Sequence, residues 1–151
     1  MAFPFISFIK SKSMNTRNRL PKKSVTFYLN LSCLFDPAEI IFLLHLVDME
    51  YMKQSGYNTA WSKEFLLLRM NLGIRLFSRV TKKLISMGLL SKEKAGNKYA
   101  YSLDMETYHK LVGFLSLTND VFKLKAFCET VFIKGKKKIQ DVTGSDLKML
   151  D

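Results

Sequence analysis

The sequence predicts a mainly α-helical domain that carries one small β-hairpin. Apolar residues recur at helical spacing in several segments between residues 37 and 133, and polar cap residues precede most of these segments. Two further segments, 89–94 and 98–103, flank the turn Ala95-Gly96-Asn97 and predict the hairpin. A chain of 151 residues with 48% hydrophobic content is long and apolar enough to form one domain with its own core.

The chain divides into an arm, a main domain, a pair of helices and a tail. Residues 1–24 are predicted to be a flexible basic arm, residues 25–103 the main domain, residues 104–133 two C-terminal helices, and residues 134–151 a polar tail. The arm can track phosphates or be a solvated chain end. At the start of the main domain, Val25–Leu31 is rich in β-branched and aromatic residues, which predicts a strand.

The segment Phe35-Asp36-Pro37-Ala38-Glu39-Ile40 predicts the start of the first helix. Asp36 can cap the unpaired amides, Pro37 suits the first helical position, and Glu39 stands where a capping box needs it. Apolar residues at helical spacing follow, so the helix should continue to about Lys53.

Ser62 is the next cap and predicts a short second helix over Lys63–Met70, with Trp61 and Leu66 as a hydrophobic staple and Phe65 pointing inward. After the turn 71–73, a third and basic helix is predicted from Ile74 to about Met87. Its buried stripe is expected to consist of Phe77, Val80 or Thr81, and Leu84. Gly88 then suits a left-handed helix cap.

Two C-terminal helices are predicted next, the first capped by Asp104 and the second by Asn119 or Asp120. The inward side of the second is expected to hold Val121, Leu124, Phe127, Cys128 and Val131. With Phe114, Phe122 and Phe132 added, the pair carries more apolar surface than one side of a small domain covers. The helices therefore form a homodimer interface, which we favour, or pack on the first helix and complete a monomer core.

The net charge of +11 is unevenly distributed. Residues 1–25 contain six Lys and Arg and no acidic residue, and residues 63–103 contain nine against two. A positive charge concentrated around the third helix and the hairpin favours a polyanionic partner over a merely basic protein.

The order helix, helix, turn, basic helix and hairpin over residues 34–103 resembles the winged helix-turn-helix superfamily of DNA-binding domains. The resemblance is closest over residues 62–90, where Leu84, three residues and then Gly88-Leu89 end the third helix as is typical of the superfamily. It implies a winged helix-turn-helix core and double-stranded DNA as the partner. The segment is similar to bacterial transcriptional regulators and equally to the N-terminal domains of some plasmid and phage replication proteins.

Helical spacing places Arg75, Ser78, Arg79 and Lys82 on one exposed ridge of the third helix, with Lys83 beside it. A helix fits the major groove of DNA, where Arg can bind guanine with two hydrogen bonds. We therefore predict base contacts from Arg75, Ser78 and Arg79, and phosphate contacts from Lys82 and Lys83. The alternative is a solvated cationic helix face.

The hairpin carries three lysines near its turn, Lys92, Lys94 and Lys98. We predict that they contact the DNA backbone as the wing of the domain. Charged residues on an edge strand also discourage aggregation, which is the alternative explanation for them.

Several other classes of protein are disfavoured. His45 and His109 have no partner at metal-ligand spacing, and the chain has no Gly-rich phosphate loop, so we expect no metal, no cofactor and no enzyme activity. Cys33 and Cys128 stand in apolar surroundings, as is typical of reduced cysteines in a cytoplasmic protein. The apolar runs are too short to span a membrane.

Three hypotheses of function follow. The first is a cytoplasmic, sequence-specific DNA-binding protein that acts as a transcriptional regulator. The second is a replication or mobile-element accessory protein that uses the same DNA-binding surface. The third is a winged-helix module that binds protein and not DNA.

Overall fold

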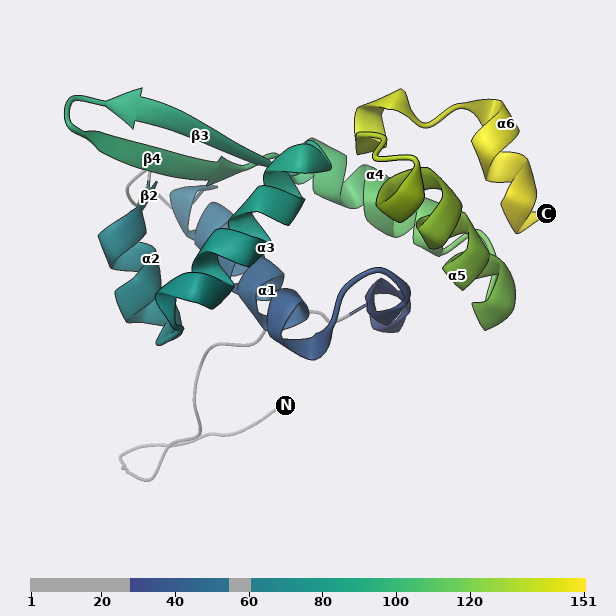
Figure 1. Cartoon of the computed structure of the whole chain (residues 1–151), viewed down its shortest axis with the longest axis horizontal. Helices are drawn as coiled ribbons and strands as arrows, with labels where there is room; N and C mark the ends of the chain where they lie inside the picture. Colours follow the sequence, from purple (N-terminus) through teal and green to yellow (C-terminus); the bar gives the residue numbers. More distant parts are fainter. Residues whose placement is uncertain (1–27, 55–60) are drawn as a thin grey trace, which may run out of the picture.

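The computed structural model describes residues 28–54 and 61–151 (Figure 1). The predicted basic arm and the first part of the predicted strand, residues 25–27, lie outside the described residues. Where the strand prediction can be tested it is wrong, because Leu29–Cys33 forms a 3-10 helix, η1. The β-branched residues that suggested a strand precede the described part. Within it, Ser32 Oγ donates to the Leu29 carbonyl at 2.8 Å and supports a turn instead.

The first helix, α1 (Pro37–Gln54), begins as predicted. The Glu39 amide donates to Asp36 Oδ1 at 2.8 Å, and the Asp36 amide donates to Glu39 Oε1 at 2.9 Å. These reciprocal hydrogen bonds are a capping box, and they satisfy two amides that the helix itself leaves unpaired.

The second helix, α2 (Lys63–Met70), is capped by Ser62, whose Oγ accepts a hydrogen bond from the Phe65 amide at 3.1 Å. The prediction that Phe65 points inward is wrong: its side chain is 41% exposed and stacks on Trp61, with ring centroids 5.3 Å apart. Trp61 is buried because it belongs to a short strand, β2 (Trp61–Ser62), that the sequence did not predict. The Phe65 ring therefore stacks on the outer face of the Trp61 ring.

The hairpin consists of β3 (Leu90–Ala95) and β4 (Lys98–Leu103), close to the predicted bounds. Ala95 pairs with Lys98, so Gly96 and Asn97 form the turn, and Gly96 has a φ of +66°. β2 pairs with β4 on the other side, which gives an antiparallel sheet in the order β2-β4-β3. The sheet ties the start of α2 to the hairpin.

The third helix, α3 (Ile74–Ser86), ends in a Schellman motif. The Leu89 amide donates to the Leu84 carbonyl at 2.9 Å, and the Gly88 amide donates to the Ile85 carbonyl at 3.0 Å. Gly88 has a φ of +82°, which confirms the left-handed cap predicted at this residue. The motif reverses the chain so that β3 follows α3 directly.

Two helices and a π-helical turn follow the hairpin: α4 (Met105–Leu115), α5 (Val121–Cys128) and η2 (Glu129–Lys134). Asp104 and Asp120 cap α4 and α5 through their side chains, as predicted. Val121 was expected to point inward and is instead exposed, because it stands in the first turn of α5, beyond the buried Leu124. In Figure 1 these helices lie on one side of the molecule and the hairpin on the other.

The C-terminal segment is folded and not the polar tail that its charged residues suggested. It forms η3 (Ile139–Asp141), α6 (Gly144–Leu147) and η4 (Lys148–Leu150). Ile139 and Leu150 are buried, and the Ile139 amide donates to the Met87 carbonyl at 2.9 Å. Val142, Leu147 and Met149 also pack against the core, so apolar contacts along the whole segment hold it on the domain.

The core lies between α1, α3, the sheet and the C-terminal helices. Phe77 of α3 is at its centre, with ring centroids 5.6 Å from Phe42 of α1 and 5.5 Å from Tyr101 of β4. The predicted stripe of α3 is confirmed, and both Val80 and Thr81 are buried in it. Since one side of α3 is fixed in the core, its opposite side must face solvent.

Candidate nucleic-acid interface

The solvent side of α3 carries the predicted ridge in part. Arg75, Ser78 and Lys82 are exposed, and they follow one another at intervals of three and four residues. Among the described residues, neither Arg75 nor Lys82 forms an ion pair. These three side chains are therefore available to a ligand along about two turns of helix.

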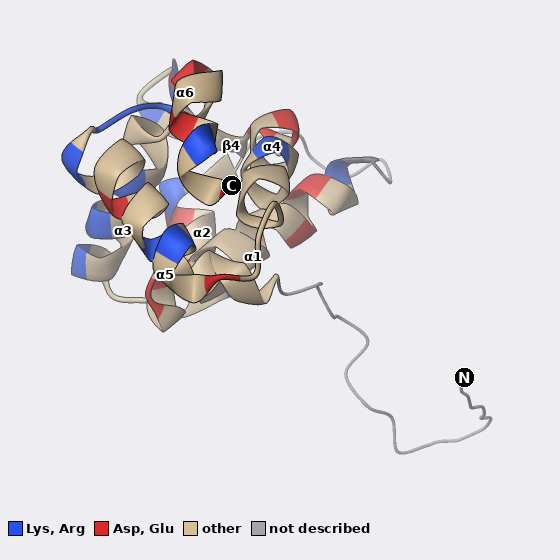
Figure 2. Cartoon of the chain, turned by 90° about the vertical axis from the view of Figure 1, so that its right-hand side faces the viewer, with Lys and Arg blue, Asp and Glu red and all other residues tan. Residues whose placement is uncertain are grey.

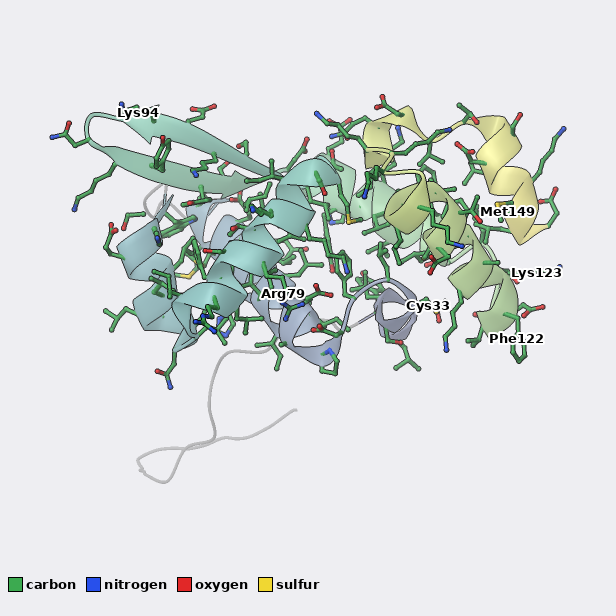
Figure 3. All side chains as sticks on the ribbon, viewed as in Figure 1. Cys33, Arg79, Lys94, Phe122, Lys123 and Met149 are labelled. Carbon is green, nitrogen blue, oxygen red and sulfur yellow. The ribbon has the colours of Figure 1, made fainter. Side chains whose placement is uncertain are left out.

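Arg79 is turned toward the start of α1 (Figure 3). Its Nη1 lies 3.2 Å from Asp36 Oδ2 and 3.1 Å from Glu39 Oε2, and its side chain is 53% exposed. A guanidinium has five N–H donors, and one nitrogen makes both of these contacts. Arg79 thus keeps donors that can reach a second partner, although its position is set by the two carboxylates.

Lys83 is held more completely. Its Nζ donates to Glu39 Oε1 at 2.9 Å and to the Leu34 carbonyl at 2.8 Å, and it lies 4.9 Å from the centroid of the Phe35 ring. An ammonium has three donors, of which two are used here. The predicted phosphate contact of Lys83 would thus have to compete with these internal partners.

Glu39 is the residue that sequence reasoning missed at this site. Its side chain is 5% exposed and accepts from Arg79, from Lys83 and from the Asp36 amide. The hydrogen bond from the Glu39 amide, and then Arg79 beside it, hold the pKa of Asp36 below its usual value. The capping-box pattern pointed to Glu39 as a helix cap, but contacts to residues 40 and 44 positions away leave no local signal.

The hairpin lysines are all exposed, but the sheet separates them into two groups. Side chains alternate along a strand, and Lys92 pairs with Tyr101 while Lys94 pairs with Tyr99. Lys92 and Lys94 therefore share the face of the buried Tyr101, which packs on α3, and Lys92 Nζ lies 4.2 Å from the centroid of the Tyr99 ring. Lys98 lies on the opposite face. Figure 3 shows Lys94 near the tip of the hairpin.

A cavity of about 490 Å³ opens beside the C-terminal half of α3. Four lysines are among the residues that line it: Lys82, Lys83, Lys136 and Lys137. The two lysine pairs come from segments about 50 residues apart in the chain, so their position side by side could not be predicted from the sequence. In Figure 2 the blue ribbon of α3 and of the chain leading to α6 lies on the same side of the molecule.

The apolar surface predicted for the C-terminal helices is mostly internal. Phe127, Val131 and Phe132 are buried in the domain core. Phe122 is 86% exposed and lies at the outer end of α5 (Figure 3). The helices thus contribute to the domain core, where α4 and α5 both contact η1 and, among the described residues, no contact of comparable extent to α1 is seen; a homodimer stays a prediction.

The described part of the chain shows neither a metal site nor a membrane-spanning helix. Within residues 28–54 and 61–151 there is no group of three or more His, Cys, Asp or Glu residues arranged to hold a metal ion. None of the helices described has the length and apolar content needed to cross a membrane. His45 is partly buried, and its pKa is lowered by burial and then by the nearby Arg69.

Comparisons with protein-family models, with curated proteins and with solved structures give no significant match to this chain. Its function is therefore inferred from its own residues and their geometry.

Proposed function

We propose that the chain is a winged helix-turn-helix protein that binds double-stranded DNA and acts as a transcriptional regulator. In this proposal α3 enters the major groove and the hairpin β3–β4 is the wing. The observation that carries it is the exposed ridge of Arg75, Ser78 and Lys82 on the one helix that directly precedes a lysine-bearing hairpin. A helix with Arg near its N-terminal end and Lys further along is suited to base contacts and then to phosphates.

The internal ion pairs refine the roles that each residue would have. Arg75 and Ser78 are the proposed base contacts, because no carboxylate of the described chain holds Arg75. Lys82, Lys92 and Lys94 are the proposed phosphate contacts on the α3 side, and Lys98 would reach a phosphate from the other face of the wing. Arg79 and Lys83 would contact DNA only if they released the carboxylates of Asp36 and Glu39.

Binding of the full chain to a random DNA duplex, measured by fluorescence anisotropy over a series of salt concentrations, tests the proposal. If about five to eight phosphates are neutralised, the logarithm of the association constant should fall with a slope near −5 to −7 against the logarithm of salt. No binding at low salt, or a slope near zero, would refute it.

Two lysine variants distinguish DNA contacts made by the α3 ridge from an effect of the net charge of the protein. Lys82→Ala should weaken binding to all duplexes and reduce the salt slope by about one. Lys125→Ala is the matched control, since Lys125 is an exposed lysine of another helix, α5, and forms no ion pair among the described residues. Lys123 of the same helix, at the far end of the molecule in Figure 3, is unsuitable because its amine donates to the Asp151 carbonyl. Equal losses in the two variants would mean that net charge and not the ridge governs binding.

Arg75→Ala tests sequence readout. It should cost about 1–3 kcal/mol on a selected site and less on random DNA. Selection from a random duplex library supplies that site. If its genomic matches lie at a replication origin and not at promoters, the same interface has the replication role.

A second candidate function, a protein-binding module, is favoured by a separate observation. Phe65 and Leu68 lie three residues apart on α2 and are 41% and 81% exposed. Exposed apolar side chains side by side are typical of protein contacts. Absence of duplex binding, together with a purified protein partner whose binding is lost in Leu68→Ser but not in Leu117→Ser, would establish this function instead.

A further inference from the structure

We propose that the cavity beside the C-terminal end of α3 binds a small amphiphilic anion, with a phosphate or carboxylate head and a short apolar body. Its volume of about 490 Å³ lies within the range of small-molecule sites in proteins. The cavity is formed by three segments that are distant in sequence: the residue after η1, the end of α3, and residues 132–137.

The apolar part of the cavity is preformed. Leu34, Met87 and Phe132 are buried residues of the domain core and line it, and Ile133 is 46% exposed at its edge. These side chains are fixed by packing with the rest of the core, so a ligand would not have to order them. Since Leu34, Met87 and Phe132 are at most 6% exposed, the apolar surface open to a ligand is mainly that of Ile133. A phosphate of a DNA strand would leave it uncovered, whereas an alkyl or aryl body would cover it.

The charged part is unbalanced in favour of an anion. Glu39 pairs with Lys83, and Asp146 pairs with Lys137 at 2.5 Å. For Lys82 and Lys136 the described residues supply no acidic partner. Two lysines without a carboxylate partner therefore line one cavity, and their combined charge matches that of a single phosphate head.

The backbone at Lys136 is a second indication that its side chain has a role. Lys136 has a φ of +51°, a left-handed conformation that residues other than glycine seldom adopt. The neighbouring Gly135 does not use this conformation. The Gly135 and Lys137 amides donate to the Thr130 and Val131 carbonyls, both at 3.0 Å, and so fix the turn. Strain of this kind is often kept at functional sites, and here it places a lysine where a glycine would fit more easily.

Occupation of the cavity would also affect the ridge. Lys82 lines the cavity and is one of the proposed phosphate contacts of α3. If the proposed DNA-binding function is correct, a bound anion and the DNA backbone compete for the Lys82 amine, and the ligand weakens DNA binding. Ligand binding itself does not depend on that function.

Isothermal titration of the full chain with hexyl phosphate tests the site, with inorganic phosphate and 1-hexanol as probes of the head and the body alone. We expect one hexyl phosphate per chain, bound at least about tenfold more tightly than inorganic phosphate, since burial of two methylene groups is enough for that ratio. Hexanoate, run in parallel, shows whether a carboxylate head also binds. Equal affinity for hexyl phosphate and inorganic phosphate, or no binding of either, would overturn the proposal.

Variants locate the binding. Lys136→Gly removes the amine and suits the positive φ, so its thermal stability should be equal to or above that of the parent chain. It should weaken hexyl phosphate about tenfold or more. Lys134→Ala removes an exposed lysine of the same segment that does not line the cavity, and it should leave the affinity unchanged. Ile133→Ser should weaken hexyl phosphate but not inorganic phosphate.

Unchanged binding in Lys136→Gly, or equal loss in Lys134→Ala, would refute the assignment to this cavity. The two proposals fail separately. Hexyl phosphate binding without DNA binding would leave the ligand site standing and overturn the proposed function, whereas DNA binding without hexyl phosphate binding would do the reverse.

Discussion

Glu39→Gln should both destabilise the domain and strengthen its binding to DNA. The carboxylate of Glu39 is almost fully buried and holds Arg79 at 3.1 Å and Lys83 at 2.9 Å. Removing one partner of a fully buried ion pair costs about 3–5 kcal/mol. Here we expect the free energy of unfolding to fall by about 2 kcal/mol, because Arg79 is 53% exposed and can be solvated. Lys83 keeps the Leu34 carbonyl as a partner.

Urea denaturation followed by circular dichroism measures the first effect. The urea concentration at the midpoint of unfolding should fall. The slope of the unfolding free energy against urea concentration should stay constant, because the surface exposed on unfolding is unchanged. Glu129→Gln is the matched control: Glu129 is exposed and forms no ion pair within the described residues, so it should change the free energy of unfolding by less than about 0.5 kcal/mol. Equal stabilities of Glu39→Gln and the parent chain would refute the inference that Glu39 holds α1 and α3 together.

The second effect is measured on folded Glu39→Gln with a random duplex. Loss of the carboxylate leaves Arg79 and Lys83 with fewer internal partners, so affinity should rise and the salt slope should steepen by up to about two. A folded variant that binds DNA less tightly than the parent chain would show that Glu39 positions Arg79 for binding and does not withhold it.

Three further changes test other parts of the structure. Gly88→Ala should lower the free energy of unfolding by about 1–3 kcal/mol, because φ is +82° and the new Cβ would lie 2.1 Å from Gln140 Oε1. In urea denaturation of a Gln140→Ala background, which already lacks the Gln140 hydrogen bonds to the Gly88 carbonyl and Thr107 Oγ1, the same change should cost only the backbone strain, and an equal cost in both backgrounds would exclude the clash. Tyr108→Phe should leave thermal stability unchanged or raise it by up to about 1 kcal/mol, since the buried hydroxyl has no hydrogen-bond partner in the part of the chain described, and a clear loss would contradict this. Burial lowers the pKa of His45 in the folded chain below the 6.5 of the unfolded chain. At a pH well above 6.5, His45 is neutral in both states. As the pH falls through 6.5, the unfolded chain takes up the proton first, so stability is lost until the pH passes the pKa of the folded chain. His45→Gln should therefore lose less stability than the parent chain between about pH 7.5 and 5.5 in urea denaturation, and an identical loss would refute the assignment to His45.

Features set by neighbouring residues could be predicted from the sequence. The caps at Asp36, Ser62 and Gly88 are local, since each is a side chain or a φ angle acting within one turn of helix, and the structure confirms all three. The strand β2 could not be predicted, because Trp61 and Ser62 become a strand only by pairing with β4, about 40 residues later. The burial of Ile139 could not be predicted either, because its surroundings are distant in sequence; its amide, for example, donates to the Met87 carbonyl.

The candidate site on α3 could also be predicted only in part, because contacts from residues distant in sequence decide which of its basic side chains are free. Spacing along α3 places Arg79 beside Arg75, and taken alone the two have the same exposure and the same chemistry. The start of α1 makes them different, because its buried Glu39 holds Arg79 and leaves Arg75 in solvent. The basic face of α3 is thus two surfaces, an outward one available to a ligand and one that α1 already occupies. In the proposed function, a substitution on α1 can therefore alter affinity for nucleic acid without changing any residue of the outward ridge.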